Sequence, residues 1–285
     1  MSKSSFKIQA LTLEDVPAVA QLSADAFETD RQTEMKGLGK EPIDMKKHGL
    51  ESLPNLLQSP QCVILKAVDE ASREVMGYCN WGFRGFKPEE MPAVEGRIQP
   101  PADVSLAKPK DNQKSSKDAE PKPEPEPETD PIKRLEARIN ADMEAWMTEV
   151  IPEGTRCIFV VGLSVSPKYQ GRGVGSALLR WGTKFCDDNG VFAWVHSSEP
   201  AWRMYEKSGF QIIKALDIEL DEYVPMPPPN EGPDAKWGHY VFRYMQYLPK
   251  KVRDPAGEVG MTACGCLVLK LYSMLPNAGM VEQLA

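Results

Sequence analysis

Apolar and polar residues follow two distinct spacings along the first third of the chain. Residues 6–10 alternate as in a short strand, and the apolar positions of residues 13–27 recur at helical spacing. A looser helical pattern covers residues 45–57, while residues 62–68 and 74–83 have the composition of two strands joined by a polar turn. We therefore predict a strand, two helices and a β-hairpin in this order.

The second half of the chain repeats this mixture. Apolar residues three or four positions apart predict one helical face within residues 131–151, formed by Ile132, Leu135, Ile139, Met143, Trp146 and Val150. The remaining patterns predict strands at 157–165, 191–197, 209–218 and 239–248, and helices at 176–188 and 200–207. We therefore predict that helices and strands are mixed along this half as well.

A change of composition divides the chain after Phe86. Prolines and charged residues take over there and culminate in residues 108–130, KPKDNQKSSKDAEPKPEPEPETD. Such a segment buries too little apolar surface to offset the entropy of ordering it, so we predict a disordered, solvated spacer. The predicted organisation is a first half-domain at 1–86, an insertion at 87–130, a helix and loop at 131–154, a second half-domain at 155–248, and an extension of unknown role at 249–285.

Charge and apolar content exclude several classes of partner. The chain has 34 basic and 41 acidic side chains, a net charge of -7, which argues against a broad nucleic-acid or acidic-membrane surface. Its longest apolar stretch, Cys157 to Val165, is far shorter than a membrane span. Six cysteines without scaffold spacing suit a reducing compartment, so we predict a cytoplasmic protein, with the nucleus left open. The closest pair, Cys264 and Cys266, is taken as two ordinary thiols, and no metal site is predicted.

The stretch QGRGVG, residues 170–175, lies between an apolar strand and a predicted helix. Glycines let successive backbone N–H groups converge on an anion, and the helix N-terminus adds partial positive charge. A P-loop would need a lysine before Ser176, and a dinucleotide-binding fold would need a different glycine spacing. On these residues alone, a tight turn and a phosphate cradle both remain open.

Two segments resemble the GNAT superfamily of acyl-CoA-dependent N-acetyltransferases. In IFVVGLSVSPKYQGRGVGSALL, from Ile158, the glycine loop is similar to the family pattern Gln/Arg-x-x-Gly-x-Gly/Ala. In AWRMYEKSGF, from Ala201, Ala201, Tyr205, Gly209 and Phe210 match the pattern A-x-x-x-Y-x-x-x-G-F. The resemblance covers residues 1–86 and 155–248, and the long irregular segment ahead of the loop is similar to fungal GNAT proteins of uncharacterised or small-molecule specificity.

This resemblance implies a fold and a substrate. The implied fold class is α/β (α+β), with a mixed, mostly antiparallel central sheet flanked by helices. The strands at 157–165 and 191–197 would be parallel and splayed to admit CoA. The implied substrate is acetyl-CoA, with no metal. Its pyrophosphate and pantetheine would be bound by Gln170, Gly171, Arg172, Gly173, Val174, Gly175, Ser176, Leu163, Val165, Ser198 and Ala201. Ser198 departs from the family, where many members carry an asparagine.

The catalytic residues follow from the resemblance only in part. Tyr205 matches a tyrosine that protonates the departing thiolate and is expected to act as the general acid. The family often places a glutamate early on the central strand, where this chain has Cys157, Ile158 and Phe159. The alternative bases lie near the end of the next strand and are His196 and Glu199. His196 is the candidate general base.

The expected activity is transfer of an acetyl group from acetyl-CoA to the primary amine of a small molecule, by direct attack in a ternary complex. One alternative is acetylation of protein lysines or N-termini. A different class of alternative is a catalytically inactive acetyl-CoA-binding module, and a third makes the proline-rich insertion an interaction arm. The sequence does not indicate the acceptor or the oligomeric state.

Overall fold

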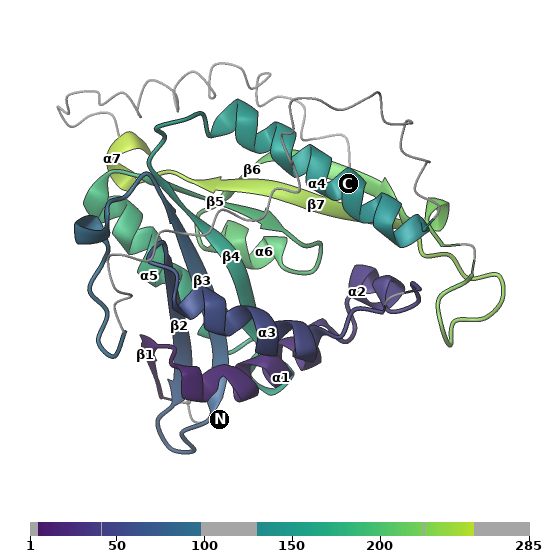
Figure 1. The fold of residues 1–285 in the computed structure, drawn as a ribbon, viewed down its shortest axis with the longest axis horizontal. Helices are drawn as coiled ribbons and strands as arrows, with labels where there is room; N and C mark the ends of the chain where they lie inside the picture. Colours follow the sequence, from purple (N-terminus) through teal and green to yellow (C-terminus); the bar gives the residue numbers. More distant parts are fainter. Residues whose placement is uncertain (1–4, 41, 98–129, 225, 254–285) are drawn as a thin grey trace, which may run out of the picture.

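A seven-stranded sheet in the order β1-β2-β3-β4-β5-β7-β6 forms the centre of the domain (Figure 1). The computed structural model describes residues 5–40, 42–97, 130–224 and 226–253. Its strands are β1 (Phe6–Ala10), β2 (Cys62–Asp69), β3 (Val75–Arg84), β4 (Cys157–Val165), β5 (Phe192–Ser197), β6 (Gln211–Glu219) and β7 (His239–Tyr247). Every neighbouring pair is antiparallel except β4 and β5, which are parallel. The predicted fold class is confirmed.

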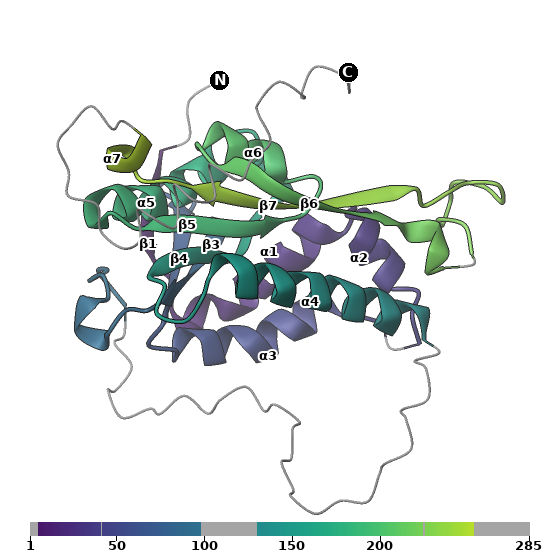
Figure 2. The same ribbon diagram turned by 90° about the horizontal axis from the view of Figure 1, so that it is seen from above.

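Helices cover both faces of this sheet (Figure 2). They are α1 (Val16–Phe27), α2 (Arg31–Lys36), α3 (Met45–Leu57), α4 (Pro131–Val150), α5 (Val174–Asn189), α6 (Trp202–Lys207) and α7 (Lys250–Arg253). Short 3-10 turns occur at Leu13–Asp15, Pro88–Glu90, Pro167–Tyr169 and Leu220–Glu222. Helices α1, α3 and α4 lie on one face, and α5 and α6 lie on the other.

Helix α4 begins at Asp130, whose carboxylate accepts a hydrogen bond from the Ile132 N–H at 2.9 Å, so the helix has a side-chain N-cap. The predicted apolar face packs across the far half of the sheet. Its first turns contact β6, β7 and the chain between them, while Trp146 stacks on Tyr244 of β7 with ring centroids 4.8 Å apart. The helix thereby closes one face over β5, β7 and β6.

Helix α5 packs on the opposite face through a glycine. A Cβ on Gly182 would lie 2.2 Å from Cζ2 of Trp81, a fully buried residue of β3. The absence of a side chain at Gly182 therefore allows the indole to lie directly against the helix. This contact fixes the distance between α5 and the sheet, and so the position of the loop that precedes α5.

Two of the boundaries that differ from the prediction concern the glycine loop and the insertion. Helix α5 begins at Val174, inside the glycine loop, two residues earlier than predicted. Residues 87–97 were assigned to the insertion, yet Arg97 donates a hydrogen bond to the Cys62 carbonyl at 2.9 Å, and Met91 and Val94 pack on the core. The described chain therefore follows the domain beyond the predicted boundary at residue 86.

Other predictions concern parts of the chain outside the described residues. These are the spacer character of residues 98–129, the extension beyond residue 253, and the thiols of Cys264 and Cys266. Within the ranges that the structure does describe, none of the helices combines the length and the apolar character needed to cross a membrane.

Candidate functional site

The parallel strands β4 and β5 separate after a short stretch of pairing. Only Cys157, Ile158 and Phe159 of β4 are in register with β5, opposite residues 192–194. From Val160 onward, β4 pairs with β3 alone. A gap between strands leaves backbone N–H and C=O groups of both strands without sheet partners, available to a ligand.

A β-bulge reshapes β4 where the gap opens. Asn80 of β3 lies opposite Gly162 and Trp81 lies opposite Val160, so Val161 is the extra residue. Its side chain is 45% exposed. Bulges change the direction of a strand and are common beside functional sites. A glycine within a strand, here Gly162, is a sequence signal for a bulge.

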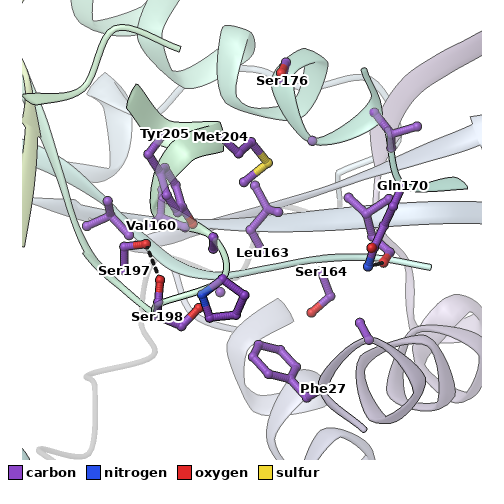
Figure 3. A pocket seen from close by; sticks show the side chains of 18 of the residues that line it. Phe27, Val160, Leu163, Ser164, Gln170, Ser176, Ser197, Ser198, Met204 and Tyr205 are labelled. Carbon is purple, nitrogen blue, oxygen red and sulfur yellow. Dashed lines mark hydrogen bonds between the residues drawn. The ribbon is translucent and has the colours of Figure 1, made fainter. Parts of the chain in front are cut away.

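A cavity of about 680 Å³ occupies the gap (Figure 3). Its walls come from the end of α1, from β4, the glycine loop and the start of α5, and from the end of β5 and α6. Among the residues predicted from the sequence, those that line it are Leu163, Val165, Gln170, Gly171, Gly173, Val174, Gly175, Ser176, His196, Ser198, Ala201 and Tyr205. One cavity thus brings together nearly all of the predicted site.

The glycine loop has a conformation that requires glycine. Gly171 and Gly173 have φ angles of +71° and +81°, in the left-handed region that side chains disfavour. A Cβ on Gly175 would lie 2.4 Å from the sulfur of Met204, so this glycine permits the close approach of α6. The Gln170 side chain donates to the Val165 carbonyl at 3.1 Å and closes the turn.

The start of α5 faces the cavity with unpaired donors. The first backbone N–H groups of a helix have no acceptor within the helix, and the helix dipole makes this end partially positive. Gly173 caps the helix without a side-chain hydrogen bond, and Val174, Gly175 and Ser176 line the cavity. This arrangement fits the pyrophosphate of CoA.

Arg172 differs from the other predicted residues in its placement. It is not among the residues that line the cavity, and its guanidinium lies over the ring of Tyr169, 5.4 Å from the ring centroid. The Tyr169 hydroxyl in turn donates to Glu74 at 2.5 Å, and Lys168 pairs with the same carboxylate at 2.8 Å. These contacts anchor the strand-to-loop corner to Glu74, the residue that precedes β3.

Tyr205 lies in the cavity wall opposite the glycine loop. Figure 3 shows its ring reaching from α6 towards the end of β5. The side chain is 4% exposed and packs edge-on against Phe210, 5.6 Å away. Burial, with a smaller contribution from the neighbouring Cys79, raises the pKa of Tyr205 above its usual range. The phenol therefore keeps its proton at neutral pH.

His196 reaches the cavity from β5, while Glu199 does not line it. The imidazole stacks on Phe242 and Tyr244, with ring centroids 4.7 and 4.6 Å away. Burial lowers the pKa of His196 to about 4, opposed by the Asp142 carboxylate, so the ring is neutral at pH 7. The Glu199 carboxylate accepts a hydrogen bond from the Val241 N–H at 3.0 Å, a contact that holds β7.

The low pKa of His196 gives a stability prediction. An unfolded histidine titrates near 6.5, so between about pH 6.5 and 4 the unfolded chain binds more protons at this position and stability falls as the pH falls. Lowering the pH from 6.5 to 5 should remove roughly 1.5 kcal/mol through His196, a loss that His196→Gln should not show. Urea unfolding at both pH values measures the difference.

The control for this experiment is His239, because its titration has the opposite sign. Asp217 and Glu219 raise its pKa, so His239 adds stability on acidification, and that stability is lost as the pH rises through its raised pKa. His239→Gln should therefore steepen the acid-induced loss, whereas His196→Gln should flatten it. Parallel curves for wild type and His196→Gln would contradict the assignment.

The structure adds residues to the site that the sequence patterns did not single out. Phe27, Asp30 and Ser164 line the cavity, the first two from the end of α1 and the residues after it. Asp30 is the N-cap of α2, a helix that had not been predicted. In the part of the chain that the structure describes, no three His, Cys, Asp or Glu side chains lie close enough to hold a metal ion.

Comparison with known proteins identifies the class of this domain. Residues 136–210, from α4 through the glycine loop to Phe210, match the model of the Acetyltransferase (GNAT) family. These residues include β4, the loop, β5 and Tyr205. The matched segment identifies a GNAT acetyltransferase domain, which indicates an acyltransferase, and its parallel strands separate beside the cavity. That family uses acetyl-CoA as its co-substrate.

Solved structures are similar to the chain at low sequence identity. A protein from the yellow fever mosquito, described as arylalkylamine N-acetyltransferase 7, has a TM-score of 0.50 and 17% identity over 85% of this chain and 87% of its own. Polyamine N-acetyltransferase from Drosophila melanogaster has a TM-score of 0.48 and 14% identity, over 86% of this chain and 100% of its own. NAA60 from Arabidopsis thaliana has a TM-score of 0.44 and 13% identity, over 86% of this chain and 98% of its own. No curated protein sequence matches the chain significantly.

Proposed function

We propose that the protein transfers an acetyl group from acetyl-CoA to the primary amine of a small molecule, by direct attack in a ternary complex. The observation that carries the proposal is the continuity of the cavity. It extends from the glycine loop, through the gap between β4 and β5, to the end of α1. An acyl donor bound along β4 and an acceptor entering beside α1 would share one space, and such placement supplies much of the acceleration of acyl transfer.

In this reaction the amine nitrogen attacks the thioester carbonyl carbon, and the C–S bond then breaks. Backbone N–H groups of β4 near Leu163 and Val165 would polarise the carbonyl, as donors aimed at a developing oxyanion do. Tyr205 would give its proton to the departing thiolate. The proton lost by the amine would pass to His196 or through water, since His196 is neutral at pH 7.

The proposal is tested by thiol release from acetyl-CoA across a panel of polyamines, arylalkylamines, amino acids and short peptides. Release with one or more small amines, at rates well above background hydrolysis, is the expected result. Release with peptides alone would replace the proposal by protein acetylation. Tight acetyl-CoA binding without release on any amine would leave an inactive binding module.

A further inference from the structure

Asp30 places a buried carboxylate in the acceptor end of the cavity. It is 6% exposed and lines the cavity beside Phe27. Its Oδ2 accepts hydrogen bonds from the Thr33 backbone N–H at 3.0 Å and from the Thr33 hydroxyl at 2.9 Å, and its Oδ1 accepts one from the Tyr240 hydroxyl at 2.7 Å. These contacts fix the carboxylate between the start of α2 and β7.

The charge of Asp30 is not balanced by a neighbouring cation among the described residues, whose ion pairs do not include it. The adjacent Arg31 turns away, where it pairs with Glu231 and donates to the Lys236 carbonyl at 2.6 Å. Burial and the Asp30 carboxylate raise the pKa of Tyr240, so this phenol stays a hydrogen-bond donor. A buried charge with neutral partners is costly on its own and is stabilised when a cation arrives.

The surroundings of Asp30 suit a cation. Figure 3 shows the Phe27 ring pointing into the cavity below β4, and an aromatic ring favours a nearby ammonium group. The Tyr240 hydroxyl that holds Asp30 also has hydrogen-bond interactions with the Ser198 side chain and the Glu199 backbone. Both residues lie at the end of β5. The carboxylate therefore lies near the end of β5, beyond the last pair that β5 forms with β4. The lysine that lines the cavity, Lys207, belongs to α6 on the opposite face of the sheet.

We propose that Asp30 selects the acceptor by charge: it binds cationic amines and rejects amines that carry a carboxylate. This inference rests on the proposed function and names its substrate class, amines without an acidic group. Asp30 attracts the ammonium form as it enters, and an amino acid would bring its own carboxylate against a buried carboxylate that cannot move away. Juxtaposed like charges discriminate strongly between ligands of the same shape.

The test compares amines with the corresponding amino acids. Tyramine and tyrosine form one pair, and cadaverine and lysine form the other, so each pair differs by one carboxylate. For the wild-type protein, kcat/KM should favour the amine by at least about 100-fold in a pair that is used at all. Asp30→Asn keeps the size of the side chain and an acceptor oxygen but removes the charge, and it should reduce this preference at least about tenfold, mainly through a higher KM for the amine.

Two further variants separate charge from structure. Asp25→Asn removes the same charge from an exposed position of α1, where Asp25 only accepts a hydrogen bond from Gln21, and it should leave the preference unchanged. Asp30→Glu retains the charge and should restore most of the preference that Asp30→Asn loses. A merely structural role of Asp30 would lower activity on both members of a pair equally.

Each outcome decides the inference. Similar kcat/KM values for amine and amino acid in the wild type, or an unchanged preference in folded Asp30→Asn, would overturn it. If Asp30→Asn does not fold, the wild-type preference and Asp30→Glu still decide the matter, because loss of the preference in folded Asp30→Glu would also refute charge selection by a carboxylate here. Failure of the proposed function gives a different result, namely no thiol release with any amine.

Discussion

Replacing Tyr205 with phenylalanine is expected to lower turnover about 100-fold while leaving the Kd for acetyl-CoA within about twofold. The ring would still pack against Phe210, so the fold of α6 should be unchanged. What disappears is a protonated phenol that lies in the cavity wall. Without that donor, the thiolate must leave unprotonated or take its proton from water.

Steady-state kinetics and equilibrium binding of acetyl-CoA measure the two halves of this prediction. Tyr247→Phe is the matched control, since Tyr247 also packs on Phe210 but its hydroxyl bonds Asp187 and it does not line the cavity. It should retain turnover. Equal turnover of wild type and Tyr205→Phe would remove the general-acid assignment and leave the cavity without an identified proton donor.

Valine at position 182 is expected to lower the free energy of unfolding by about 3 kcal/mol. Any side chain there must displace the Trp81 indole, whose ring atoms would lie 2.2 to 2.4 Å from the new Cβ. The indole is fully buried in β3 and has no free space to enter. Helix propensity slightly favours valine over glycine, so the loss would come from packing alone.

Chemical denaturation of Gly182→Val and Arg180→Val measures this effect. Arg180 is exposed on the same helix, so valine there changes helix propensity without touching the sheet. The control should lose no more than about 0.5 kcal/mol. If both variants unfold at the same denaturant concentration, the Trp81 contact does not set the packing of α5.

Much of the fold follows from local pattern. Strand β4 is an apolar run interrupted only by Gly162 and Ser164, and α4 carries its apolar residues on one face, so both were predicted within a residue of their observed bounds. The fold class and the parallel pairing of β4 with β5 came from the family resemblance and are confirmed. Helix α2 was not predicted, because its six residues carry no apolar periodicity and depend on the Asp30 cap.

The candidate site was predictable only where a motif marks it. The glycine loop and the Tyr205 segment have fixed spacing, and the structure places both at one cavity, although their roles stay predictions. Asp30 has no such mark. Its hydroxyl partner Tyr240 is 210 residues away in the chain, so neither residue signals the other until the sheet has formed. The same holds for His196, whose low pKa depends on rings from β7.

The short pairing between β4 and β5 divides the sheet into two parts that few hydrogen bonds connect. Strands β1 to β4 form one hydrogen-bonded ladder and β5, β7 and β6 form another, joined by three residue pairs. Packing of α4 and α5 across the junction supplies the remaining cohesion. A ligand that bonds to both free strand edges takes the place of the missing ladder. If acetyl-CoA binds there, as proposed above, the resistance of this domain to local opening rises with the acetyl-CoA concentration, and the acyl donor takes the role of a removable strand.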